Sequence, residues 1–543
     1  MGQREALSGE ELLDSSNIVE SYPGVVRPLT QSFASGVYRQ IFKASVDRLT
    51  GSGEMSERLS EDLNDMLVFS DWHAYYRLAS WYSVLSLIPF SAFVKRAWRS
   101  SLGVEHAAGD AGLGAPVPWG VKGSVIKNFF RYLGSSPDEV AEICDRIRPV
   151  LADGRQKVDS TDDPEELLGL IDLLQAEVLS CWDLTLFNDI YTFVWMFLAG
   201  NKAKRVATER RELDSMRPVR AMRELVGVAS EFGLESEQYA AARSKFLTSY
   251  GDRAPGELKL ETRTWRSAPE SLDAFVASHL ADAQREGGAA DADDVRKDEK
   301  AEPAKGIPMR NALKGTAMRE RSRLMRSEMF GIVRSCYDKI GEALRQRSLI
   351  EAATDVYYLT TQEVEAALRQ RADMRDVVRE RKLHEATLLN APSPKTLRVC
   401  GPRPWDHSAG SLAAQHHGSS WREDGVGMGT GTSPGCFTGT AVIVDGKQAG
   451  ASLVGRVIIA VSTDPGWAYL LDGAGAIVAE RGSMLSHTAI ISRELGIPSV
   501  VGVKEATTQI RTGDIVEVDG TQGTVRIVAT CQDGHEKDAC LSL

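Results

Sequence analysis

The sequence predicts a multidomain α+β protein, in which a large, mostly α-helical region is followed by a small β/β/α domain. In much of residues 33–250, apolar residues recur at i, i+3 and i+4, a spacing that places them on one face of a helix. Residues 433–529 instead contain short β-branched runs, and two of these flank Asp519-Gly520, a hairpin signal. Residues 399–432, between these regions, are rich in Gly and Ser, as linkers are.

Composition indicates a soluble cytoplasmic protein. The chain has 543 residues, of which 43% are hydrophobic and 26% charged, and its net charge of −11 argues against general nucleic-acid binding. Its seven cysteines form no C-x-x-C pair, so we expect reduced thiols and no metal site. The N-terminus lacks the apolar run of a secretory signal, and no apolar stretch is long enough to span a bilayer.

Changes in composition along the chain give the expected domain boundaries. The predicted segments are a disordered N-terminus at 1–16, a helical domain at 17–398 with a flexible insertion at 281–306, a Gly-rich swivel linker at 399–432, a small domain at 433–529, and a disordered tail at 530–543.

The helical domain should contain several amphipathic helices. They are predicted at Phe33–Leu49, Ser56–Leu67, Pro137–Leu151, Asp163–Leu186 and Val219–Phe232. The aromatic segment Ala74–Phe93 reads as a buried core helix; alternatively, its Tyr76 and Trp81 line a pocket for an apolar ligand. Arg323 lies in a basic helical segment and either faces a phosphate group or pairs with a nearby glutamate.

One short helix in the small domain carries the strongest chemical signal. It follows a turn at Gly482; Ser483 or Ser486 can cap it, and Gly496 can end it. His487 then lies in the first turn, where the helix dipole favours an anion and disfavours an imidazolium. A neutral imidazole can act as a nucleophile. The alternative is that His487 has no chemical role and is merely tolerated at the start of the helix.

The surrounding motifs resemble the phosphohistidine swivelling domain of PEP-utilising enzymes, such as PEP synthase and rifampicin phosphotransferase. Ser433-Pro-Gly435, Thr463-Asp-Pro-Gly-Trp467 and Gly513–Gly520 match this family in its motif order. The resemblance implies that His487 is the phosphorylated nucleophile. It also implies that Ser486 and Thr488 assist catalysis, and that Gly482, Ser483 and Arg493 bind the phosphoryl group.

Two upstream segments resemble the acceptor domain of the same family. Asn17–Ser32 is similar to its entry segment, which implies that Pro28 and Thr30 lie near the substrate. Tyr250–Leu260 is similar to a loop in which histidine usually stands at the position of Asp252. Asp252 could then replace that histidine as a general base, and neighbouring Arg253 could bind phosphate.

We find no ATP-grasp region and no PEP-binding barrel in the sequence. The resemblance therefore implies a separate ATP-grasp subunit that binds ATP and Mg²⁺ and delivers the β-phosphoryl group of ATP to His487. A small-molecule hydroxyl, such as that of a natural product or antibiotic, would be the acceptor. The alternatives are a non-catalytic binding subunit and an enzyme that uses the helical pocket for a reaction without phosphoryl transfer.

Overall fold

The computed structural model of the chain describes residues 10–89, 91, 119–206, 216–285, 306–388, 394–400, 413–414, 421–422, 425–444, 453–482 and 486–530. Within these ranges, no helix combines the length and the apolar character that crossing a bilayer requires. The predicted insertion at 281–306 and the tail at 530–543 fall largely outside them, as does Ser483.

The described residues form two compact units. The first, here called the helical unit, comprises 1–198, 258–262 and 310–416; the second, here called the sheet unit, comprises 199–257, 263–309 and 417–543. This division differs from the predicted boundary at 398, because three helices upstream of it belong to the sheet unit. Their amphipathic pattern predicts an apolar face, but does not say which surface that face covers.

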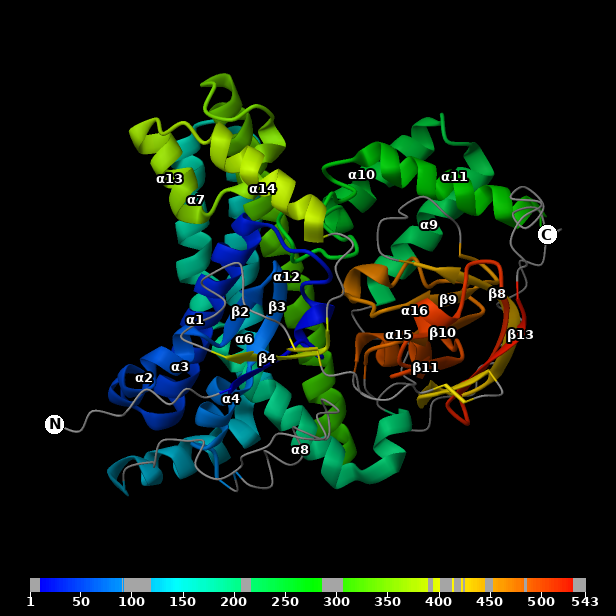
Figure 1. The fold of residues 1–543 in the computed structure, drawn as a ribbon, viewed down its shortest axis with the longest axis horizontal. Helices are drawn as coiled ribbons and strands as arrows, with labels where there is room; N and C mark the ends of the chain where they lie inside the picture. The colour runs from blue at the N-terminus through cyan, green and yellow to red at the C-terminus, as the bar shows by residue number, and fades with distance from the viewer. Residues whose placement is uncertain are drawn as a thin grey trace. The chain divides into compact units, whose positions relative to one another are not determined.

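Five long helices build most of the helical unit (Figure 1). They are α1 (Pro28–Thr50), α6 (Trp119–Ser160), α7 (Pro164–Glu177), α8 (Asp183–Val206) and α12 (Ile307–Gln346). Proline opens α1 and Gly51 ends it in a left-handed conformation, while the Asp163 side chain caps α7. The other α-helices of this unit are α2 (Glu54–Arg58), α3 (Ser60–Asn64), α4 (Leu78–Leu85), α13 (Thr361–Gln370) and α14 (Arg375–Leu388).

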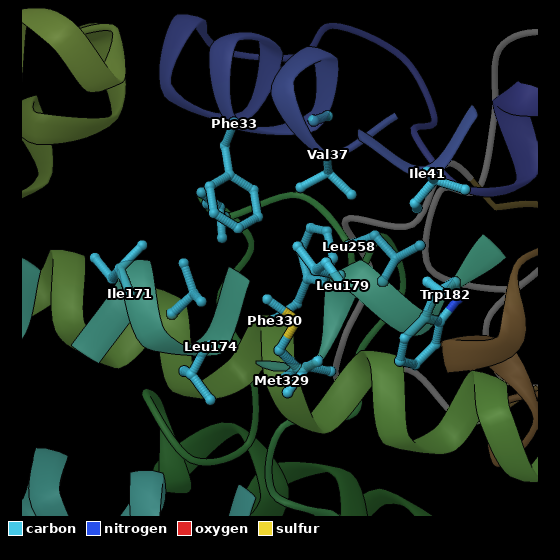
Figure 2. Close-up of a cluster of buried hydrophobic side chains, with 14 of the residues drawn as sticks. Phe33, Val37, Ile41, Ile171, Leu174, Leu179, Trp182, Leu258, Met329 and Phe330 are labelled. Carbon is cyan, nitrogen blue, oxygen red and sulfur yellow. The ribbon is translucent and has the colours of Figure 1, made fainter. Parts of the chain in front are cut away.

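The core of the helical unit lies between α1, α7 and α12. Phe33 and Val37 of α1 point toward Phe330 of α12, and Ile171 of α7 lies beside them (Figure 2). The Phe33 and Phe330 rings meet edge to face with their centroids 5.5 Å apart, a favourable aromatic geometry. All four side chains are less than 5% exposed, so the predicted apolar faces do form one core.

A five-stranded antiparallel sheet in the helical unit corrects three predictions. Its order is β2 (Leu67–Ser70), β3 (His73–Arg77), β1 (Glu10–Asp14), β4 (Thr396–Cys400) and β5 (Ala413–Ala414). The predicted disordered N-terminus thus contains β1, and the predicted helix at Ala74–Phe93 begins as β3 and becomes helical only at Leu78. The predicted helix at Ser56–Leu67 is divided between α2, α3 and the start of β2.

The reason is non-local pairing. Every residue of β1 pairs with β4, almost 400 residues later in the chain, and Leu13 and Leu397 are buried together with Tyr75. Asp71 and Trp72 both have positive φ, as the tight turn between β2 and β3 requires. Non-local pairing explains β1, whose partner lies outside any local window, whereas β2 and β3 form a local hairpin that the helical prediction missed.

The sheet unit is built on eight strands in the order β6-β13-β12-β8-β9-β10-β11-β7. Figure 1 labels β8, β9, β10, β11 and β13 of this sheet. They are β6 (Val426–Met428), β7 (Thr430–Ser433), β8 (Cys436–Ile443), β9 (Val457–Ala460), β10 (Ala476–Ala479), β11 (Ser499–Val501), β12 (Ile515–Asp519) and β13 (Thr524–Ala529). The predicted hairpin is β12–β13. Strands β8 to β11 run parallel, and every residue of β9, β10 and β11 is buried, as expected for central parallel strands.

The predicted linker at 399–432 extends too far, because β6 and most of β7 lie within it. Gly429 and Gly431, at the end of this segment, allow strands to approach closely. A Cβ atom on Gly429 would lie 2.6 Å from the Val501 carbonyl oxygen, and one on Gly431 would lie 2.2 Å from that of Gly520.

Three helices upstream of the sheet belong to this unit, namely α9 (Arg217–Phe232), α10 (Glu237–Tyr250) and α11 (Pro269–Arg285). They share one core with the sheet, in which Val219 and Phe275 are buried with Ile458 and Ile491. The overall class, multidomain α+β with a large helical region and a small C-terminal β-containing domain, is the predicted one.

Candidate functional site

The turn between β10 and α15 (His487–Leu495) positions the predicted nucleophile. Gly482 has φ +135, and a Cβ atom there would lie 2.9 Å from the Ser486 hydroxyl oxygen, so the turn requires glycine. Ser486 caps α15 by accepting a hydrogen bond from the Ala489 amide at 3.4 Å, and Gly496 ends the helix with φ +67. The predicted helix and both of its caps are confirmed, and His487 is its first residue.

His487 lies in a buried setting fixed by hydroxyl groups. Its side chain is 2% exposed. The hydroxyls of Thr488 and Thr463 are hydrogen-bonded at 2.8 Å, and Ser492 donates to the Thr488 carbonyl oxygen at 2.5 Å. These hydrogen bonds hold the first turn of α15 in a defined orientation, and His487 lies at the N-terminal end of this helix, where backbone amides lack intrahelical partners.

Thr463 was not among the predicted site residues, although a signal for it was present. It follows β9 as His487 follows β10, and these two strands are parallel neighbours. The carboxyl ends of neighbouring parallel strands meet at one edge of a sheet, which is where sites form in such folds. This rule brings the segment after β9 next to the first turn of α15.

Asp464, also absent from the predicted set, connects this edge to the loop after α10. Its carboxylate accepts hydrogen bonds from the amides of Gly256 and Gly466, both at 2.8 Å, and from the Trp467 indole at 3.1 Å. Burial, reinforced by the nearby Glu257 carboxylate, raises the pKa of Asp464 to about 7. The Asp-Pro-Gly-Trp motif is thus an anchor for the 252–257 loop.

The predicted residues of that loop are both ion-paired. Asp252, the candidate base, accepts from Arg266 Nε at 3.1 Å, and Arg253, a candidate phosphate ligand, donates to Glu257 at 2.8 Å. Arg253 and Glu257 are both less than 10% exposed. Asp252 and Arg253 therefore both make ion pairs within the sheet unit, and their catalytic roles remain predictions.

Arg493, another candidate phosphate ligand of this unit, lies along its own helix. Its Nε donates to the Ala489 carbonyl oxygen at 2.6 Å, and burial lowers the pKa of Arg493 to about 10. His487, Ser486, Thr488, Gly482 and Arg493 thus belong to one turn and one short helix.

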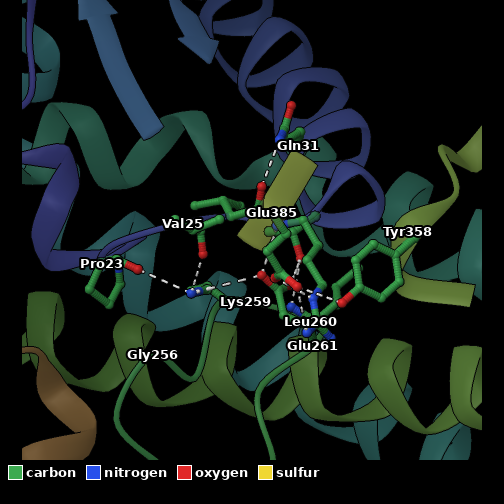
Figure 3. A network of polar contacts seen from close by, with 12 residues as sticks. Pro23, Val25, Gln31, Gly256, Lys259, Leu260, Glu261, Tyr358 and Glu385 are labelled. Carbon is green, nitrogen blue, oxygen red and sulfur yellow. Dashed lines mark hydrogen bonds and ion pairs between the residues drawn. The ribbon is translucent and has the colours of Figure 1, made fainter. Parts of the chain in front are cut away.

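The remaining predicted residues lie in the helical unit. Pro28 and Thr30 are buried in the first turn of α1, and the Thr30 hydroxyl donates to Glu261 at 2.5 Å and accepts from the Leu260 amide at 2.8 Å. Lys259 of the same short segment donates to the carbonyl oxygens of Pro23 and Val25, as Figure 3 shows.

This network holds the predicted entry segment against residues 258–262, and the Thr30 hydroxyl forms its hydrogen bonds with Leu260 and Glu261 of that segment. Tyr76 and Trp81 lie together, with ring centroids 5.3 Å apart, and Arg323 lies on α12. Across the described ranges, no group of three or more His, Cys, Asp and Glu side chains is arranged to hold a metal ion.

Comparisons with known proteins identify the segments that carry these features. Residues 454–523 match the PEP-utilising enzyme mobile domain, and residues 201–336 match the rifampicin phosphotransferase fourth domain. The matches confirm the resemblance stated from the motifs. The first contains His487 and Thr463, and the second contains the 252–257 loop.

Several curated proteins are similar to parts of the chain. Uncharacterized phosphotransferase YvkC of Bacillus subtilis is 32% identical over 200 residues, which are 35% of this chain and 23% of YvkC. Rifampicin phosphotransferase of Bacillus cereus is 24% identical over 315 residues, which are 54% of this chain and 35% of that protein. A probable phosphoenolpyruvate synthase of Pyrococcus abyssi is 45% identical over 98 residues, 18% of this chain and 12% of the synthase. The chain thus spans less than half the length of these relatives.

Proposed function

We propose that the chain carries a phosphoryl group on His487 and transfers it to a hydroxyl group of a small molecule. The observation that supports this most is the placement of His487 as the first residue of α15, within a segment matched by the PEP-utilising enzyme mobile domain. The helix N-terminus offers amide donors to a phosphoryl group, and the hydroxyls of Ser486 and Thr488 flank the imidazole in sequence.

The reaction takes place in two displacements. An imidazole nitrogen of His487 attacks the phosphorus of the donor, a P–N bond forms, and the bond between phosphorus and the leaving oxygen breaks. The acceptor hydroxyl oxygen then attacks phosphorus, the P–N bond breaks, and the hydroxyl proton passes to a base. Such transfers need little covalent help, so positioning and charge neutralisation account for most of the catalysis.

We propose that the donor is an ATP-grasp protein acting on this chain, with ATP as the source of the phosphoryl group. Mg²⁺ would arrive with the nucleotide and neutralise its phosphate oxygens. Asp252 is the proposed base for the acceptor proton, with Arg266 orienting its carboxylate. The acceptor is bound by the helical unit in this scheme.

The test is intact-mass and peptide analysis of the full chain after incubation with Mg-ATP, with and without an ATP-grasp protein. A parallel reaction uses phosphoramidate, a small phosphodonor that needs no partner. We expect one acid-labile phosphoryl group on the peptide that contains His487. The substitution His487→Ala should abolish it, whereas His279→Ala, in α11 of the same unit, should leave it unchanged.

Phosphate on wild type with phosphoramidate alone would establish the reactive histidine and leave the partner to be found. Absence of acid-labile phosphate on His487 under all of these conditions would overturn the proposal. Labelling that persists in His487→Ala would overturn the assignment of the nucleophile.

A further inference from the structure

A series of buried hydroxyl groups, here called the hydroxyl chain, joins strands β7 and β11 to helix α15. The Thr432 hydroxyl of β7 lies 2.6 Å from the Ser499 hydroxyl of β11, which lies 2.7 Å from the Ser492 hydroxyl of α15. Ser492 in turn donates to the Thr488 carbonyl oxygen at 2.5 Å. These residues are at most 4% exposed, so the hydroxyl chain is shielded from water along its whole length.

The direction of each hydrogen bond in the hydroxyl chain is fixed by the number of protons available. A carbonyl oxygen only accepts, so the one hydroxyl proton of Ser492 goes to Thr488. Ser492 must then accept from Ser499, and Ser499, whose proton is used in that bond, must accept from Thr432. The Ser499 carbonyl oxygen, 3.4 Å from the Thr432 hydroxyl, is the weaker of its two acceptors. All three hydroxyls therefore point toward the first turn of α15, and each bond polarises the next.

An irregularity in the sheet brings Thr432 into the hydroxyl chain. Strands β7 and β11 are antiparallel, and their register shifts between Ser499, which lies opposite Ser433, and Val500, which lies opposite Gly431. Thr432 is the extra residue between these two pairs, as in a β-bulge. In a regular strand its side chain would point to the opposite face from Ser433, because successive side chains alternate. Here its hydroxyl instead reaches Ser499, and bulges commonly re-aim a side chain in this way beside active sites.

The hydroxyl chain ends on the residue that follows the proposed nucleophile. Serine hydroxyls in helices often bond to the carbonyl four residues earlier, but here the same Ser492 hydroxyl also accepts from Ser499, which ties the helix to the sheet. The Thr488 side chain is held separately, by its 2.8 Å hydrogen bond to Thr463. Because both the carbonyl and the side chain of Thr488 are fixed, the adjoining backbone of His487 has little freedom to rotate.

We infer that Thr432, Ser499 and Ser492 are positioning residues for phosphoryl transfer at His487. They act through Thr488, which holds the first turn of α15 and with it the direction of the imidazole. Apolar side chains would fill the same buried space, but they would not hold the Thr488 carbonyl. The inference rests on the proposed function only in naming phosphoryl transfer; the effect of the hydroxyl chain on the His487 side chain can be measured without it.

The test measures the rate at which phosphoramidate phosphorylates His487 in the full chain. Thr432→Val keeps the shape of the side chain and removes its hydroxyl, whereas Thr432→Ser keeps the hydroxyl and removes a methyl group. Ser499→Ala interrupts the hydroxyl chain at its centre. We expect the limiting rate to fall at least about tenfold in Ser499→Ala and at least about threefold in Thr432→Val, because a misplaced nucleophile slows the chemical step. The phosphoramidate concentration at half the limiting rate should stay unchanged, and Thr432→Ser should react as wild type does.

Thr264→Val is the matched control. Thr264 is a buried threonine of the same unit, and its hydroxyl accepts from the Ser267 amide at 3.4 Å. This variant should react at the wild-type rate. If Thr432 only fills space, Thr432→Ser is the more disturbed variant, because it leaves a cavity, and Thr432→Val is not slowed. Wild-type rates in both Thr432→Val and Ser499→Ala, or equal losses of rate in Thr432→Ser and Thr432→Val, would overturn the inference and leave the proposed function intact.

A spectroscopic measurement separates the two proposals. The nine histidines of the chain are labelled with ¹³C at Cε1, and the NMR resonance of His487 is identified by its loss in His487→Ala. This resonance should shift or split in Ser499→Ala and stay in place in Thr264→Val. If wild type takes up no phosphate but the resonance responds in this way, only the proposed function fails. An unmoved resonance in Ser499→Ala would overturn the inference whatever the result of phosphorylation.

Discussion

Replacing Gly466 by alanine tests whether the Asp-Pro-Gly-Trp turn is anchored to the loop after α10. A Cβ atom at this position would lie 1.9 Å from the carbonyl oxygen of Ala254 and 2.7 Å from the nitrogen of Pro255. These are backbone atoms and cannot rotate away. The φ angle of Gly466 is not positive, so the alanine backbone itself is unstrained and the substitution tests the contact alone.

The magnitude follows from the geometry. The shortest contact is roughly 1.5 Å below the 3.4 Å at which ordinary van der Waals contact begins, so the loop must move away from the turn. Overpacking of this kind typically costs about 1–3 kcal/mol. The movement also separates the Gly256 amide from the buried Asp464 carboxylate, which adds about 1 kcal/mol or more. We therefore expect Gly466→Ala to lower the free energy of unfolding of the sheet unit by about 2–4 kcal/mol.

Thermal and urea unfolding of the full chain measure this effect. For a unit of this size, each kcal/mol corresponds to roughly 2–4 °C in Tm, so a decrease of about 4 °C or more is expected. Gly227→Ala is the control, because Gly227 lies in α9 of the same unit with no atom within 4 Å of a new Cβ. That variant should be as stable as wild type or more so. An unchanged Tm in Gly466→Ala would refute the anchoring argument.

Four further predictions concern the same unit. Burial raises the pKa of Asp464 to about 7 in the folded state, so protonated Asp464 contributes to the free energy of unfolding. This contribution is fully present below about pH 4 and is lost as pH rises through about 7, by up to about 1.4 kcal/mol per pH unit. Urea unfolding between pH 5 and 8 should show this pH dependence in wild type and a weaker one in Asp464→Asn. Thr463→Val removes the 2.8 Å hydrogen bond to Thr488 and should slow phosphate incorporation in the phosphoramidate assay while costing only about 1 kcal/mol of stability. Ser486→Ala removes the cap of α15 and should cost about 1 kcal/mol in urea unfolding, and an unchanged midpoint would argue against the cap. Arg223→Ala removes a bidentate ion pair with Asp472. Because the Arg223 side chain is 52% exposed, the free energy of unfolding should fall by less than about 1 kcal/mol, and this difference should vanish in 1 M NaCl.

The sequence alone determined the parts of this protein that depend on local interactions. Helix α15 begins at His487 and ends before Gly496 because its cap and its left-handed stop are both encoded locally, at Ser486 and Gly496. The β12–β13 hairpin is likewise specified by alternation around Asp519-Gly520. The candidate nucleophile could be found in this way, since its position depends on one turn and one helix.

Only the tertiary structure decided which distant segments meet. Strand β1 exists because β4 pairs with it. Gly429 and Gly431 lie in a segment with the composition of a flexible linker, yet they allow close contacts between strands. Helices α9 to α11 share a core with the C-terminal sheet, which brings Gly256 to Asp464 across 208 residues. The ion pairs of Asp252 and Arg253 follow from such packing. Pairing of this kind depends on burial and geometry between remote elements, and these are not encoded in any short window of sequence.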